Sequence, residues 1–403
     1  MFRPLHYLVV LLLAVGSAGE GWGRTWTSSY GKAIEGELVE FDGETVELKL
    51  ADGRMSKFKV SLLSEDDQVF LREWKESVGG GVDEAPASRE WPEQVEVDIS
   101  LDDIVIVEED RDKERYVYRS PHFEFEANGR LSKNVVRDFS QVFEATLEAV
   151  RALPINLDAK PPEDGYWDVK LFNTEEQYFR DGAPEGSGGV YFPSTGLVKV
   201  PLPHLGVDYT GVRYVVDSSK TNATLKHEIV HQVMHDLLPY MPVWMYEGFA
   251  EFVQCMPYSN GRYRFNDVDD AIKEYVAEGE REYELVDLQS LMEMDGETWA
   301  EELLDEKAWK NYESSCVLLY YFLRIDGEGD GAGIFSYLDE VLTAEGVRDW
   351  DAVFAKAQKT HILRDRDFDT LRAEISERLR SNNTLGLRIT FGEPSEISKK
   401  VVE

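Results

Sequence analysis

The sequence has few cysteines and, after its first residues, no long apolar run. Only two of its 403 residues are cysteines, Cys255 and Cys316, which excludes a disulfide framework in place of a hydrophobic core. A single bridge and a pair of buried thiols are both compatible with the sequence. Past residue 19, no uncharged stretch approaches the roughly 20 residues that a membrane-spanning helix needs. We therefore expect no membrane insertion of the mature chain.

Basic residues are also scarce. The chain has 43 Lys and Arg against 78 Asp and Glu, which gives a formal net charge of −35. A field of this sign repels nucleic acid and anionic membranes, so neither is an expected partner. We interpret the acidity as favouring solubility in a salty or extracellular setting. The oligomeric state does not follow from the sequence.

Residues 1–19 have the layout of a secretory signal peptide. Arg3 and His6 precede the apolar run 7–15, and small residues occupy 16–19. This pattern predicts cleavage after Ala18 or Gly19 and a secreted or periplasmic protein. No cysteine lies near that point to carry a lipid anchor.

Residues 24–76 predict a small β-barrel of short strands. The expected strands cover 24–27, 33–41, 45–50 and 55–60, with Asp-Gly turns at 42–43 and 52–53. The segment resembles the Sla1 homology 1 domain, an SH3-like module. The likeness is carried by Arg24-x-Trp26-x-x-x-x-Gly31, Ile34-x-Gly36-x-Leu38-Val39, Asp42-Gly43-x-x-Val46 and Leu63-Ser64-x-x-Asp67-Gln68. In family terms such a module binds short peptides or serves as an appendage.

A second domain follows a linker that we place at 77–95, because 79–81 are glycines and 83–86 are polar or small. Within 96–385 we expect a hairpin of strands 104–108 and 116–125 and a helix over 132–153 capped by Ser132. Strands are expected at 167–172 and 190–200, the latter broken at 193–196, and a mostly helical remainder from Thr221. Residues 386–403 are assigned to a C-terminal tail with one strand pattern at 387–391.

A helical segment over 224–234 carries a pattern suited to metal binding. His227 and His231 are four residues apart, so both imidazoles lie on one face, one turn apart. Glu228 follows the first histidine and is placed to take a proton from a metal-bound water. Two solvated histidines on an ordinary helix would give the same spacing. The pattern therefore predicts a metal site only together with a third ligand.

The next predicted helix supplies that ligand. Glu247 and Glu251 share one face of the segment 244–252, which is otherwise largely apolar. Buried carboxylates require a compensating cation, so we predict Glu247 as third ligand and an open fourth position for water. Glu251 is expected to accept the free N–H of His227 and fix its ring. His235 is excluded as a ligand beside His227, because eight helical residues rise about 12 Å.

This pair of helices, His227-Glu228-x-x-His231 and Glu247-Gly248-Phe249-Ala250-Glu251, resembles the gluzincin zinc metallopeptidases. Residues 115–360 are similar to peptidase MA-like, DUF1570-type proteins. Softer matches are Gly188-Gly189-Val190-Tyr191, Pro242-x-Trp244 and the helix 312–320. The resemblance implies a zincin-like α+β domain, a Zn²⁺ cofactor, a peptide or protein substrate, and Tyr312 as a second donor to the oxyanion.

The sequence thus predicts a secreted zinc metallopeptidase with Glu228 as general base. Two alternatives stay open. One is a metal-dependent hydrolase with another substrate on the same scaffold. The other is a non-catalytic peptide- or surface-binding protein that acts through its N-terminal SH3-like domain. The Glu228 carboxylate favours an enzyme, since an unpaired charge beside two metal ligands is costly without a catalytic role.

Overall fold

The computed structural model describes most of the chain beyond the N-terminal segment. The described residues are 24–28, 32–41, 45–50, 54–64, 67–68, 71, 90–155, 157, 159–162, 165–217, 223–303, 309–344, 347 and 349–393. The predicted signal peptide, the Asp-Gly turns of the first domain and the glycines of the linker lie outside these residues. The chain forms two compact units, a smaller one with the N-terminal strands and a larger one with most of the chain after residue 88.

The smaller unit contains an antiparallel sheet of order β1-β2-β3-β4. Its strands are β1 (Arg24–Thr27), β2 (Ala33–Phe41), β3 (Thr45–Leu50) and β4 (Met55–Lys59), as the alternation predicts. A short 3-10 turn, η1 (Val60–Leu62), follows, and a bridge joins Ser28 to Leu63. No closed barrel is formed by the described strands.

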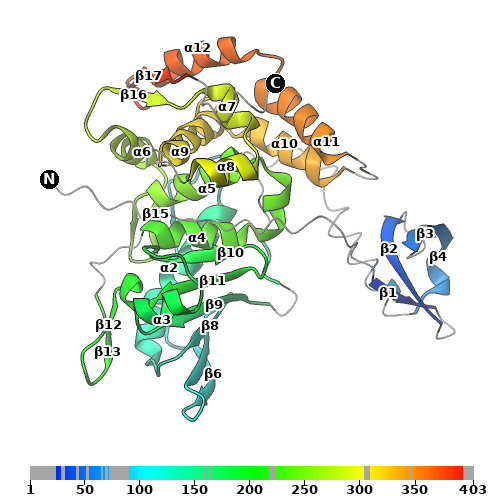
Figure 1. Ribbon diagram of the computed structural model, residues 1–403, viewed down its shortest axis with the longest axis vertical. Helices are drawn as coiled ribbons and strands as arrows, with labels where there is room; N and C mark the ends of the chain where they lie inside the picture. The colour runs from blue at the N-terminus through cyan, green and yellow to red at the C-terminus, as the bar shows by residue number, and fades with distance from the viewer. Residues whose placement is uncertain are drawn as a thin grey trace. The chain divides into compact units, whose positions relative to one another are not determined.

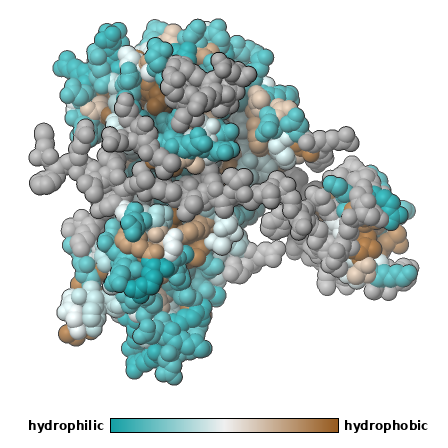
Figure 2. All heavy atoms as spheres, viewed as in Figure 1, coloured by the Kyte–Doolittle hydropathy of each residue, from teal (hydrophilic) through white to brown (hydrophobic). Residues whose placement is uncertain are grey.

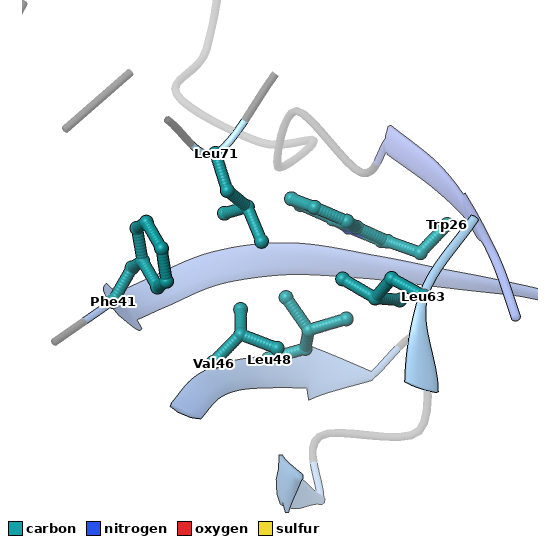
Figure 3. Packing of buried hydrophobic residues seen from close by; sticks show 6 residues of the cluster. All are labelled: Trp26, Phe41, Val46, Leu48, Leu63 and Leu71. Carbon is teal, nitrogen blue, oxygen red and sulfur yellow. The ribbon is translucent and has the colours of Figure 1, made fainter. Parts of the chain in front are cut away.

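Six buried side chains make the core of this unit. Figure 3 shows them converging from the strands and from the segment that follows β4: Trp26, Phe41, Val46, Leu48, Leu63 and Leu71. The Trp26 indole N–H donates to the carbonyl of Gly36 across 2.8 Å, so the largest side chain is buried without an unmatched donor. Asp67 Oδ2 accepts from the amide of Thr27 across 2.6 Å and holds the end of β1.

The larger unit is built on a mixed sheet of order β10-β11-β9-β8-β7-β6. The strands are β6 (Val105–Asp110), β7 (Arg115–Arg119), β8 (Phe123–Ala127), β9 (Trp167–Phe172), β10 (Val190–Phe192) and β11 (Leu197–Pro201). Strands β8, β9 and β11 are parallel, whereas β10 is antiparallel to β11 and forms one edge. The prediction of strands at 167–172 and on both sides of 193–196 is confirmed.

The predicted single strand 116–125 is wrong. The structure divides it into β7 and β8, which pair antiparallel around the turn at Ser120 and Pro121. Proline has no N–H to donate to a neighbouring strand, so it interrupts the ladder. The apolar alternation on both sides concealed that turn.

The longer helices of the larger unit include α2 (Lys133–Arg151), α4 (Ala223–Val233), α5 (Val243–Cys255) and α9 (Trp309–Arg324). Ser132 caps α2 by accepting from the amide of Val135, as predicted. Helix α5 packs against both α4 and α9 (Figure 1). Its burial on both sides explains its nearly continuous apolar sequence.

Short helices and small sheets make up the rest of the described chain. The helices are α3 (Glu175–Arg180), α6 (Val268–Ala277), α7 (Leu288–Glu293), α8 (Gly296–Glu302), α10 (Ala332–Leu342), α11 (Trp350–Ala357) and α12 (Phe368–Leu379), with η2 (Leu202–Leu205), η3 (His235–Tyr240) and the π-helical η4 (Gln358–Leu363). The strands are β5 (Gln94–Glu96), β12 (Val207–Tyr209), β13 (Tyr214–Val216), β14 (Tyr258–Ser259), β15 (Arg262–Arg264), β16 (Glu282–Leu285) and β17 (Arg388–Phe391).

The C-terminal strand pattern is present as β17. It pairs in parallel with β16, more than a hundred residues earlier, from Glu282↔Arg388 to Leu285↔Phe391.

On the face in Figure 2, hydrophilic side chains predominate among the described residues, as the composition leads one to expect. No helix within the described residues is long and apolar enough to cross a membrane. Cys255 and Cys316 are both free thiols.

Candidate metal centre

The two histidines predicted as ligands lie one turn apart on α4. Both are buried, each with 1% of its surface exposed. Their rings turn toward each other, and the two Nε2 atoms are 2.9 Å apart. Since α4 is covered by α2, α5 and β10, neither imidazole is a solvated side chain. The alternative that His227 and His231 are two solvated histidines on an ordinary helix is therefore excluded.

Glu247 comes from α5, which follows α4 after η3 and begins at Pro242 as its N-cap. Its Oε2 lies 3.2 Å from Nε2 of His227 and 3.4 Å from Nε2 of His231. Ligand atoms of the three side chains lie within 4.8 Å of one another. Their geometry lets the buried His227, His231 and Glu247 hold one metal ion.

The Glu247 carboxylate supports a cation at this point. It is fully buried, and among the described residues neither of its oxygens accepts a well-oriented hydrogen bond. Such a buried carboxylate is costly unless a neighbouring positive charge compensates it. A metal ion between Glu247 and the two imidazoles would remove that cost, so the donor set fits a metal on physical grounds.

The charges of the cluster are strongly coupled. Burial works against ionisation of Glu247, but His231 and His227 outweigh it and lower the pKa of Glu247 to about 2. Burial also opposes protonation of His227, yet the carboxylates of Glu247 and Glu251 beside its ring raise its pKa well above the ordinary value. Burial dominates for His231 and lowers its pKa. The carboxylates thus favour a positive charge between them, which a proton or a metal ion can supply.

Glu228, the predicted base, lies beside the cluster with no exposed surface. Its Oε2 accepts from the backbone N–H of Tyr191 in β10 across 2.7 Å, whereas Oε1 has no hydrogen-bond partner among the described residues. Burial raises the pKa of Glu228 to about 7, although the charge of His227 and the Tyr191 N–H act in the opposite direction. A carboxyl with such a pKa can both accept and return a proton near neutrality.

Glu251 lies close to His227, at an ion-pair distance but without an aligned hydrogen bond from Nδ1. Its Oε1 is 2.9 Å from Nδ1 of His227. Its Oε2 accepts from the hydroxyl of Tyr275 across 2.5 Å and from Nε2 of Gln254 across 2.9 Å. The sequence did not point to Tyr275, which is on α6 and shares no motif with Glu251.

Of the two remaining candidates, Tyr312 lies close to the cluster and His235 does not contact it. Tyr312 on α9 has its ring centroid 6.0 Å from that of His227 and 5.2 Å from that of Trp299. Burial, and then the charge of Glu247, raise the pKa of Tyr312 well above its ordinary value, so its hydroxyl keeps its proton. His235 starts η3 and contacts the hydroxyl of Tyr191 rather than the cluster.

Gly248 permits the close packing of α5 on α9. A Cβ at this position would lie 2.8 Å from the carbonyl oxygen of Ser315 and 3.0 Å from Cβ of Leu319. Any side chain here would push apart the helices that carry Glu247 and Tyr312. The glycine in Glu247-Gly248 thus has a packing role next to Glu247.

No protein-family model matches the sequence, and no curated protein matches it either.

Proposed function

We propose that the chain is a zinc-dependent metallopeptidase of gluzincin type. The observation that carries this proposal is the buried His227, His231 and Glu247 cluster with the Glu228 carboxyl beside it. A structural metal site is usually closed by four protein ligands, whereas three ligands and an adjacent carboxyl are the composition of a catalytic zinc site. Two imidazoles and one carboxylate suit Zn²⁺ among the common divalent ions.

His227, His231 and Glu247 would hold the metal, and the bound ion would lower the pKa of a water molecule and polarise the substrate carbonyl. The acid–base work belongs to Glu228. Its Oε2 is fixed by the amide of Tyr191, so Oε1 is the oxygen that takes the proton from the attacking water. The same carboxyl then gives that proton to the nitrogen of the leaving amine, which returns Glu228 to its starting charge.

Tyr312 is proposed as a donor to the oxyanion. Its ring lies against His227, and its raised pKa keeps the hydroxyl protonated, as a donor requires. Because Glu228 has no exposed surface, a peptide reaches these groups only when neighbouring side chains move. Substrate entry is then coupled to opening of the site.

The N-terminal sheet is proposed to be an SH3-like, Sla1 homology 1-type domain, and the larger unit a zincin-like domain. The protein would be secreted or periplasmic and would act on a peptide or protein. Four antiparallel strands around the Trp26 core are compatible with the first assignment.

Elemental analysis of the metal-replete, full-length protein tests the site. The expected result is about one zinc per chain in the wild type, its loss in His231→Ala and Glu247→Ala, and hydrolysis of an unstructured protein such as casein by the wild type alone. A wild type without metal would overturn the proposal and turn attention to peptide binding by the N-terminal unit. Zinc without hydrolysis of any peptide panel would leave a metal-dependent hydrolase of another class.

A further inference from the structure

The orientation of His227 depends on a chain of contacts that leads away from the metal cluster. An imidazole can present Nε2 to a metal only if its proton is on Nδ1. Oε1 of Glu251, 2.9 Å from Nδ1, is the carboxylate oxygen that can take that proton, although among the described residues the two groups are not aligned as a hydrogen bond. The orientation of this carboxylate therefore decides which tautomer His227 adopts and where Nε2 points.

We propose that Tyr275 is a positioning residue for the metal centre, because its hydroxyl holds Glu251 in the orientation that fixes His227. This inference rests on the metal site of the proposed function but not on peptide hydrolysis. Tyr275 donates to Oε2 of Glu251 across 2.5 Å. With Oε2 engaged, Oε1 is the oxygen that faces His227.

Tyr275 holds Glu251 from a second helix, whereas the other donor, Gln254, is on the same helix as Glu251. Gln254 is three residues from Glu251 on the same helix, α5, so its amide moves with the carboxylate that it contacts. Tyr275 belongs to α6 (Val268–Ala277), which packs against both α5 and α9. Its hydroxyl thus ties the carboxylate to a second element of the framework.

The hydroxyl is suited to this role. Burial, and then the negative charge of Glu251, raise the pKa of Tyr275 well above its ordinary value, so it remains a donor. Glu251 itself has only 5% of its surface exposed, and a hydrogen bond to a buried carboxylate is among the stronger kinds. Loss of the hydroxyl leaves the ring in place and removes one donor to Oε2.

The test measures zinc affinity of the full-length apo protein by competition with a chromophoric chelator. Tyr275→Phe is expected to bind Zn²⁺ about tenfold more weakly than the wild type. This is the lower end of the loss in metal affinity seen when a residue that supports a metal ligand is substituted. Tyr337→Phe is the matched control, since Tyr337 is also buried and donates to the carbonyl of Tyr240 across 3.1 Å, away from the cluster. It should keep wild-type affinity.

A double-mutant cycle separates positioning from general stabilisation. Once Glu251→Gln has altered the group through which Tyr275 acts, adding Tyr275→Phe should change zinc affinity by less than twofold. Equal affinities of the wild type and Tyr275→Phe, or a further tenfold loss in the double variant, would overturn the inference alone. A wild type that binds no zinc would overturn the metal centre as well.

Discussion

The backbone N–H of Tyr191 donates to Oε2 of Glu228 across 2.7 Å, which links the edge strand β10 to the helix α4. This contact fixes one oxygen of a carboxylate that has no exposed surface. A side-chain donor could be removed by substitution, whereas a backbone donor depends only on the position of the strand. The strand therefore determines that Oε1 is the oxygen of Glu228 without a hydrogen-bond partner among the described residues.

Glu228→Gln is expected to lower peptide hydrolysis by roughly 10²–10⁴-fold, the contribution of a general base. Its amide oxygen can still accept from Tyr191, so the local structure should persist. Zinc content, measured by elemental analysis of the same preparation, should stay at the wild-type value. Loss of zinc together with activity would mean that Glu228 is a ligand rather than the base.

Metal binding should stabilise the fold, because only the folded chain brings His227, His231 and Glu247 together. With free zinc a thousandfold above the Kd, the free energy of unfolding should rise by about 4 kcal/mol. Urea unfolding with and without a chelator measures this difference. Glu247→Ala should show no response to zinc, whereas the exposed control Glu284→Ala should respond like the wild type. An equal response in all three proteins would place the stabilising metal elsewhere.

A second buried carboxyl should make stability depend on pH. Burial, and then the charge of Glu251, raise the pKa of Glu313 to about 8, although Tyr283 donates a hydrogen bond to it. The folded state thus holds this proton more tightly than the unfolded state. The stabilisation is complete below about pH 4.5 and is lost as the pH rises toward 8, on the order of a few kcal/mol.

Glu313→Gln checks this expectation, because the amide carries no charge at any of these pH values. Its free energy of unfolding, measured from pH 5 to pH 8, should fall less steeply than that of the wild type. At pH 8 the variant should be the more stable of the two. The exposed Glu284→Gln should leave the wild-type slope unchanged. Parallel curves for Glu313→Gln and the wild type would contradict the shifted pKa.

Gly248→Ala should destabilise the larger unit by about 1–3 kcal/mol, the usual cost of overpacking. The added methyl would meet the Ser315 carbonyl oxygen at 2.8 Å, and backbone cannot move aside cheaply. Gly189→Ala is the matched control, since its Cβ would have ordinary contacts from 3.7 Å outward. Chemical denaturation of both variants gives the comparison. An equal change in the free energy of unfolding of the two variants would contradict the packing role of Gly248.

Much of the site could be predicted because helical geometry converts spacing into direction. The four-residue interval between His227 and His231, and again between Glu247 and Glu251, fixes a shared face whatever surrounds the helix. Strand alternation likewise predicted the strands of the smaller unit and β9. The turn between β7 and β8 was missed because the apolar alternation continues on both sides of Ser120 and Pro121.

The sequence by itself determined which residues could be ligands, since local periodicity needs no knowledge of distant contacts. Only the tertiary structure decided that α5 brings Glu247 to within 3.4 Å of both imidazoles. It also decided that Tyr191 and Tyr275 complete the surroundings, because they approach from β10 and α6. Such contacts join segments 24 to 37 residues apart, and their formation depends on how whole elements pack rather than on any local pattern.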